Sequence, residues 1–210
     1  MVHNNWVYDK AAKVYRFREH LMWMYDGDDQ YYTSNTRLYM TYVNQAPKQH
    51  WTAAVVESEI SALKTAMTIG YLLNRTVILP RFHNGSEAAE FPLSAILHIK
   101  SFDNYFAGHY RENSFLRHPK VPPDVKSGLS EKLAVDKFGV TFTPRQPLTI
   151  SDTVIVRQFG DMRDKVLVFE NLLDVQVLLG NRSNDIAFIN KIDRAFLYSE
   201  YDQKRISANA

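Results

Sequence analysis

Two aspartates, Asp26 and Asp28, are separated by one glycine, and Asp26 comes directly after the apolar run 21–25. Carboxylate oxygens are the ligands that Mg²⁺ and Mn²⁺ prefer, and a cation held there would neutralise a bound anionic group. Asp and Gly are also residues that commonly form turns. A metal site at Asp26 and Asp28 is therefore one hypothesis, and a surface turn is the alternative that we favour.

A second group of polar side chains follows two apolar runs. Asn44 and Gln45 come directly after the run 38–43, and Arg81 and His83 come after the run 76–80. If both runs are parallel strands, their carboxyl ends share one edge of a sheet, where open α/β proteins bind ligands. An arginine suits an anionic group such as a diphosphate, and the amides suit sugar hydroxyls. Ordinary solvated loop residues are an equally good interpretation.

Arg111 belongs to a polar segment, 111–114, between two aromatic residues. Its guanidinium could clamp a carboxylate or phosphate and reach the same edge of the sheet. A structural Arg–Glu pair with Glu112 that fixes a loop is the interpretation we favour somewhat more. The same two interpretations apply to residues 18–20.

Other titratable residues offer less specific signals. His50, Glu57 and Glu59 flank the start of a predicted helix, where one of them could act as a base toward an acceptor hydroxyl. We favour the alternative, in which the two glutamates stabilise the amino half of the helix through its dipole. Four further histidines show no i, i+4 pairing, so zinc is not expected; these are His83, His98, His109 and His118.

The elements that must position these residues are predicted by hydrophobic spacing. Apolar residues at alternating steps of four and three predict a helix over 54–73, with Asn74 ending it in the left-handed conformation. The run 76–80 has no polar residue after Thr76, which suits a strand covered on both faces. Together with a strand over 38–43, this predicts a βαβ unit in a three-layer, Rossmann-like α/β domain. We expect a mainly parallel sheet with 76–80 at its centre.

The remaining chain gives a coarser prediction. We divide it into an aromatic-rich amino-terminal segment, 1–37, and a single α/β domain, 38–210. Within these we expect one proline-rich loop region at about 115–150. The predicted helices are 10–24, 99–106 and 185–198, and Ile189, Ile192 and Phe196 share one face of the last helix. The predicted strands are 153–157 and 165–169.

Composition excludes several function classes. The 210 residues carry a formal net charge of +2, no cysteine, and no run of five or more Lys or Arg. A nucleic-acid partner is therefore not expected, and disulfides and thiolate metal sites are excluded. We see no apolar leader and no apolar run near the ~20 residues of a membrane helix, so no membrane contact is expected from this segment. The chain is either cytosolic or a piece of a longer protein whose targeting lies elsewhere.

Several segments resemble a known family. The first is Phe17–His20 with Trp23, Tyr25–Asp26 and Tyr31–Tyr32; the others are Ala62–Pro80, Pro92–Leu93, Tyr110–Leu116 and Pro119–Lys126. This pattern resembles a region of plant-type extensin arabinosyltransferases, members of the nucleotide-diphospho-sugar transferase family, over roughly residues 15–128. The run 72–80 also looks like the first lobe of protein O-fucosyltransferase-like enzymes, which have the GT-B fold.

The resemblance implies part of a glycosyltransferase, appended to a catalytic domain elsewhere in a longer chain. It implies a nucleotide sugar or glycan acceptor as partner, a Golgi or secretory location, and Mn²⁺ or Mg²⁺ at Asp26 and Asp28, which fit the Asp-x-Asp motif of GT-A enzymes. GT-B enzymes bind the donor mainly through their second lobe, and the loop 43–50 keeps Asn44 and Gln45 but lacks the family's glycines. We therefore expect the isolated chain to be inactive.

Two alternatives to a transferase lobe stay open. One is a non-catalytic module that binds glycans or stabilises a neighbouring domain, and the other is an unrelated cytosolic α/β binding protein. Glycosylation sequons begin at Asn74, Asn84 and Asn181. The Asn84 loop is the best candidate for glycosylation if the chain is secretory.

Overall fold

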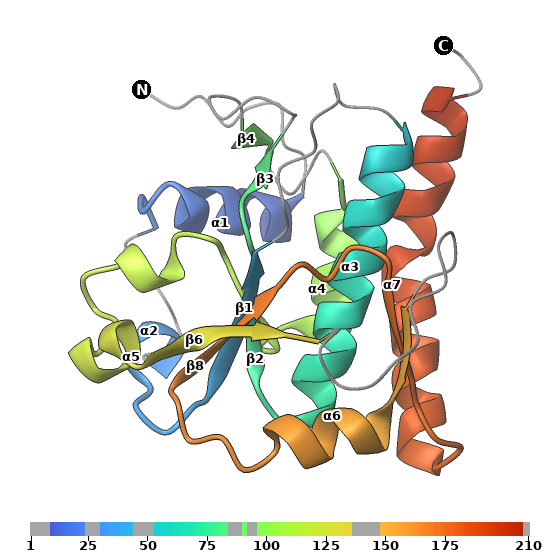
Figure 1. Ribbon diagram of the computed structural model, residues 1–210. Coiled ribbons are helices and arrows are strands. Elements are labelled where there is room, and N and C mark those ends of the chain that lie inside the picture. The colour runs from blue at the N-terminus through green and yellow to red at the C-terminus, as the bar shows by residue number, and fades with distance from the viewer. Residues whose placement is uncertain are drawn as a thin grey trace.

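Five parallel strands form the centre of the fold, in the order β5–β2–β1–β8–β6. The computed structural model describes residues 9–23, 30–43, 53–83, 90–91, 96–135 and 148–207. Helices flank the sheet on both faces (Figure 1), so the predicted three-layer, Rossmann-like fold is confirmed. The strands are β1 (Tyr39–Val43), β2 (Thr76–Ile78), β5 (Tyr110–Arg111), β6 (Leu129–Ala134) and β8 (Val166–Glu170).

The helices divide between the two faces of the sheet (Figure 1). One face carries α3 (Ala53–Leu72), α4 (Ile99–Phe106), α6 (Asp152–Phe159) and α7 (Ser183–Ser207). The other face carries α2 (Gln30–Thr33), the 3-10 helix η2 (Phe115–Arg117) and α5 (Pro123–Ser127), and α1 (Lys10–Glu19) packs beside α4.

Alternate side chains of β1 and β2 enter the two cores, as the pleat requires. In β1, Met40 and Tyr42 join the larger core under α3, whereas Tyr39 joins the smaller core beside α5. In β2, Val77 and Ile78 divide in the same way. Both faces of these strands are therefore buried, which explains why their sequences are nearly continuous apolar runs.

The βαβ unit predicted from the sequence is confirmed. β1 and β2 pair in parallel, and α3 contacts both strands. Asn74 adopts a φ of +51°, and the next residue, Arg75, donates its N–H to the carbonyl oxygen of Gly70 at 2.8 Å, which closes the helix as expected. The predicted central position of 76–80 is wrong, because β1 occupies the centre and β2 lies one place to its side.

The predicted strand over 153–157 is wrong, because these residues belong to α6. Their β-branched run suggested a strand. The helical signal lies in the spacing: Ile155 and Phe159 are four apart and buried, while Val156 between them is 46% exposed. Asp152 begins the helix, where a negative charge is favourable.

The predicted proline-rich loop also contains regular structure. Pro123 is the first residue of α5. Proline suits this position, because an N–H there would have no acceptor within the helix. β6 follows as an edge strand that exposes the charged side chains of Glu131 and Lys132, together with Leu129. Charges protect an edge strand from pairing with other chains, and they also removed the apolar alternation that would have revealed it. Residues 136–147 of this region lie outside the described residues.

The remaining predictions concern the carboxyl-terminal half. The strand over 165–169 is confirmed as β8, and the helices near 10–24, 99–106 and 185–198 are confirmed as α1, α4 and α7. The predicted buried face of α7 is partly wrong, since Ile189 is 41% exposed and Phe188 is buried instead. Two small sheets complete the fold; they are β3 (Phe82–His83) with β4 (Glu90–Phe91), antiparallel, and β7 (Leu148–Ser151) with β9 (Val175–Leu178), parallel.

Candidate functional site

The strand order reverses beside β1, and this reversal marks the most promising edge of the sheet. From β1 the chain moves to β2 and β5 on one side, and later to β6 and β8 on the other. In open α/β sheets, ligands bind outside the carboxyl ends of the strands at such a reversal. At this edge the N–H of Asn171 donates to the carbonyl oxygen of Val43 at 2.9 Å, so β1 and β8 end together. The loop that joins β1 to α3 leaves from the same point.

Of the predicted ligand residues Asn44, Gln45, Arg81 and His83, the structure describes both backbone and side chain for Arg81. Arg81 follows β2 by three residues and is exposed. His83 lies in β3, although its side chain is outside the described residues, as are Asn44 and Gln45 in the β1–α3 loop. A shared site for these four residues therefore stays a prediction.

The proposed metal ligands, Asp26 and Asp28, also lie outside the described residues. Among the residues that the structure does describe, no three His, Asp or Glu side chains gather closely enough to hold a metal ion. No described helix has the length and apolar character of a membrane span either.

Arg111 is enclosed by protein groups. The residue is 1% exposed, and its Nε donates to the carbonyl oxygen of Tyr31 at 3.2 Å while Nη1 donates to that of Tyr110 at 2.7 Å. The guanidinium carbon lies 4.1 Å from the centre of the Tyr31 ring. Burial lowers the pKa of Arg111. These contacts are structural, but their partners are backbone carbonyl oxygens and a tyrosine ring and not the favoured Glu112 pair. The predicted role of Arg111 toward a ligand stays a prediction.

Glu112, next along the chain, is a fully buried carboxylate held by two phenols. The hydroxyl of Tyr31 donates to one carboxylate oxygen at 2.6 Å, and that of Tyr32 to the other at 2.9 Å. Burial, and then the adjacent Glu112, raise the pKa of Tyr31 well above its usual value, so the phenol remains a donor. The Arg18 guanidinium lies 3.7 Å from the centre of the Tyr31 ring. Glu112 thus accepts hydrogen bonds from two tyrosines, and its charge also favours the charged form of the Arg111 guanidinium.

Several of the other titratable residues singled out in the sequence have structural surroundings. Nδ1 of His98 accepts the N–H of Ser101 at 3.3 Å and caps α4. His118 is buried and stacks on Tyr32 with ring centres 3.7 Å apart. On α3, Glu57 is exposed and Glu59 is buried. His50 lies outside the described residues, so the acceptor-base hypothesis stays a prediction.

A cleft of about 700 Å³ opens at the opposite edge, where the parallel strands begin. It lies between the amino ends of β1, β2 and β5 and the helices α3, α4 and α7. This volume falls in the range of small-molecule sites. The lining residues are Thr36, Arg37, Leu38, Met67, Gly70, Tyr71, Asn74, Arg75, Thr76, Val77, Tyr105, Phe106, Ala107, Gly108, His109, Asn184, Ala187, Phe188 and Lys191.

The cleft is basic. Arg37, His109 and Lys191 reach it from three different segments, and no Asp or Glu occurs among the described residues that line it. Arg75 also lines the cleft, but its guanidinium donates to three backbone carbonyl oxygens and ties β2 to the segment before β8. Burial lowers the pKa of His109, and the neighbouring cations Lys191, Arg37 and Arg111 lower it further.

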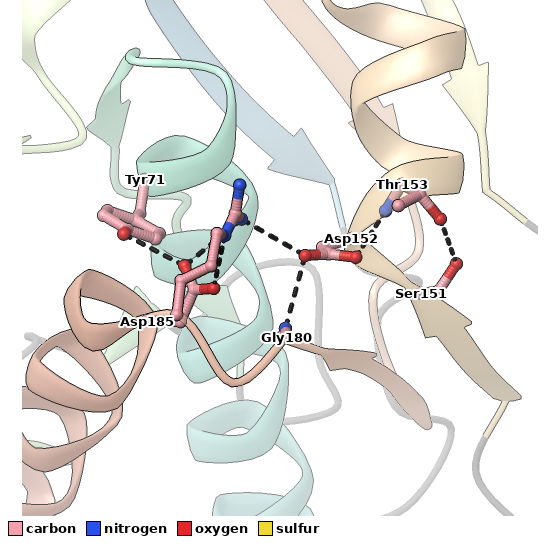
Figure 2. A network of polar contacts seen from close by, with 7 residues as sticks. Tyr71, Ser151, Asp152, Thr153, Gly180 and Asp185 are labelled. Carbon is pink, nitrogen blue, oxygen red and sulfur yellow. Dashed lines mark hydrogen bonds and ion pairs between the residues drawn. The ribbon is translucent and has the colours of Figure 1, made fainter.

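A polar network fixes the wall of the cleft formed by α3 and α7 (Figure 2). Asp185, in the first turn of α7, accepts a hydrogen bond from the Tyr71 hydroxyl at 3.2 Å and from Arg182 Nε at 2.7 Å. Arg182 Nη2 also contacts Asp152 at 3.2 Å, and Asp152 accepts the N–H groups of Thr153 and Gly180. The bond from Arg182 lowers the pKa of Asp185. Both carboxylates have hydrogen-bond partners within the protein, so the network has a structural role and links α3, α6 and α7.

This cleft was not predicted from the sequence, although one signal for it is present there. Arg37 and Arg75 immediately precede the strand predictions 38–43 and 76–80. Residues before two parallel strands share an edge, just as residues after them do. His109 gave no such signal, because β5 has two residues and no periodicity.

Comparison of the chain with protein-family models, with curated proteins and with solved structures found no match.

Proposed function

We propose that this chain is an accessory lobe of a nucleotide-sugar-dependent glycosyltransferase. It would present a nucleotide sugar or glycan acceptor at the carboxyl edge of its sheet, beside a neighbouring transferase domain in a longer chain. The observation that carries the proposal is the reversal of strand order at β1, which opens this edge beside the β1–α3 loop. The family resemblance over residues 15–128 supports the choice of substrate class.

Electrostatics at this edge favours an anionic group. The 20-residue helix α3 begins at Ala53, directly after the β1–α3 loop, and its first turn contains no acidic residue. The N–H groups and dipole of a helix amino terminus favour a phosphate. Arg81 is exposed at the end of the neighbouring strand and adds a formal charge. In the proposal, the diphosphate lies toward these groups and the sugar toward Asn44 and Gln45.

The accessory role follows from what the sequence lacks. The β1–α3 loop is without the glycines that allow a close backbone approach. One His-x-Arg sequence occurs, at His109–Arg111, but Arg111 is 1% exposed and its guanidinium donates to the carbonyl oxygens of Tyr31 and Tyr110. Mn²⁺ or Mg²⁺ at Asp26 and Asp28, and a secretory location, belong to the same proposal. Incubation of the purified chain with sugar nucleotides, Mn²⁺ and peptide acceptors should give little or no product. Robust turnover that is abolished by Asp26→Asn and Asp28→Asn would contradict the accessory role.

Binding tests the site directly. We expect isothermal titration of the chain with a panel of nucleotide sugars and glycans to identify at least one ligand. Arg81→Ala should then weaken its binding by about tenfold, since a hydrogen bond to a charged group contributes ~1.5–3 kcal/mol. Arg117→Ala, which removes an exposed arginine from η2, is the matched control. Unchanged affinity of the Arg81→Ala variant for every ligand of the parent chain would contradict the assignment.

A further inference from the structure

We propose that the basic cleft at the amino edge of the sheet is a second binding site, for a small phosphate monoester that carries a flat ring, such as a nucleoside monophosphate. The cleft is bounded by Arg37, His109 and Lys191 on its charged side. It lies across the sheet from the carboxyl edge considered above and does not depend on the proposed glycosyltransferase function.

The basic side chains converge from separate parts of the chain. Arg37 precedes β1, His109 ends the turn between α4 and β5, and Lys191 lies in the third turn of α7. Arg37 and Lys191 are cationic at neutral pH, and among the described lining residues no carboxylate neutralises them. Like charges gathered at one place repel each other, and a dianionic phosphate between them would relieve the repulsion.

The geometry of Arg37 suits a phosphate. Its Nη1 donates to the carbonyl oxygen of Gly108 at 2.8 Å, which holds the guanidinium against the α4–β5 turn. That bond uses one of the five N–H groups of the side chain, and the fork geometry of the guanidinium matches phosphate oxygens. Gly108 has a φ of +81°, and apart from the glycine and its two chain neighbours no heavy atom lies within 4 Å of the position that a Cβ would take there. The turn is therefore open beside the arginine.

The apolar walls suit a ring. Met67, Phe106 and Val77 are buried at the base of the cleft. Tyr71 and Phe188 form a second wall, with rings stacked at 4.2 Å between centres and 13° between planes. The hydrogen bond that the Tyr71 hydroxyl donates to Asp185 fixes the position of this wall. Small-molecule sites combine such apolar surfaces with a few convergent polar groups.

Isothermal titration with uridine monophosphate and phenyl phosphate tests the proposal. We expect both to bind, and both to bind more tightly than inorganic phosphate or uridine. Lys191→Ala removes an exposed lysine and introduces a strong helix former, so the fold should be preserved. This variant should weaken binding by about tenfold or more, as should Arg37→Ala. Lys120→Ala and Arg117→Ala remove exposed cations near α5 and η2 and should leave the affinity unchanged.

Four results would overturn the proposal. They are no binding of either monoester, equal binding of inorganic phosphate, unchanged affinity in Lys191→Ala, or equal losses in the control variants. Arg37→Lys keeps the charge but loses the fork, so partial recovery relative to Arg37→Ala is expected if the variant is folded. Arg81→Ala should not affect binding of the monoesters. Failure of this site is therefore distinguishable from failure of the proposed glycosyltransferase site.

Discussion

At the scale of single residues, buried charge in this molecule is met by specific donors. Glu112 has no exposed surface, and an unpartnered carboxylate there would be costly. The Tyr31 and Tyr32 hydroxyls supply two hydrogen bonds to it from α2. Bonds to an ionised acceptor are stronger than neutral ones. Glu112 therefore joins the amino-terminal segment to the carboxyl end of β5.

This role predicts a clear effect on stability. Tyr31→Phe removes the 2.6 Å bond to Glu112 and should destabilise the fold by about 1–3 kcal/mol, because the carboxylate remains buried with one donor fewer. Urea unfolding measures the change as a lower midpoint. Tyr105→Phe removes the hydroxyl of a half-buried tyrosine on α4 and should shift stability by less than about 0.5 kcal/mol. Equal midpoints for Tyr31→Phe and the parent chain would contradict the role of Glu112.

His109 provides a second test at the residue scale. Burial lowers its pKa, as do the cations that face it: Lys191 on α7, Arg37 before β1, and Arg111 on β5. The folded state therefore binds this proton less readily than the unfolded state. The resulting contribution to stability is constant above pH 6.5 and becomes unfavourable as the pH falls through 6.5 toward the folded pKa.

We expect Lys191→Gln to raise the pKa of His109, measured by NMR titration of its ring protons. The same variant should lose less stability on acidification than the parent chain does. Lys120→Gln, on the other side of the sheet, is the control and should leave the His109 titration as it is. A His109 pKa that is the same in Lys191→Gln and the parent would show that Lys191 does not act on this histidine.

At the scale of elements, the sequence predicted those whose burial produces a simple pattern. β1, α3, β2, β8 and α7 were found because each has a continuous apolar run or a helical apolar stripe. β6 was missed because an edge strand carries charges, and α6 was misassigned because β-branched residues outweighed a two-residue helical signal. The carboxyl edge of the sheet was predicted from the residues that follow two apolar runs. The cleft was not predicted, because His109 reaches it from the residue before β5, and a two-residue strand has no periodicity in the sequence.

The packing of α3 on β2 gives a prediction about an element. A Cβ on Gly70 would lie 2.7 Å from Val77 Cγ2 and 2.9 Å from the carbonyl oxygen of Arg75. Gly70→Ala gains about 1 kcal/mol of helix propensity, but overpacking of this kind costs about 1–3 kcal/mol. We expect a net loss of stability in urea unfolding. Ser61→Ala, at an exposed position of α3, should be neutral or slightly stabilising. A more stable Gly70→Ala protein would show that α3 and β2 pack less closely.

At the scale of the whole molecule, the sheet has two edges with different chemistry. The carboxyl edge combines Arg81 and the start of α3 at the reversal of strand order. The amino edge holds the basic cleft, with aromatic walls. Elements from both halves of the chain build each edge, because β8 and α7 pack beside the βαβ unit. A ligand at either edge would therefore stabilise the whole domain against unfolding.

The central claim is that a nucleotide sugar or glycan acceptor binds at the carboxyl edge. Chemical-shift mapping of the backbone amides during titration with the panel of nucleotide sugars and glycans tests it most directly. The account predicts that a binding ligand shifts the amides of Val43, Arg81 and Asn171, which lie at that edge. Shifts confined to the amides of Arg37, His109 and Lys191, or no shifts with any member of the panel, would contradict it.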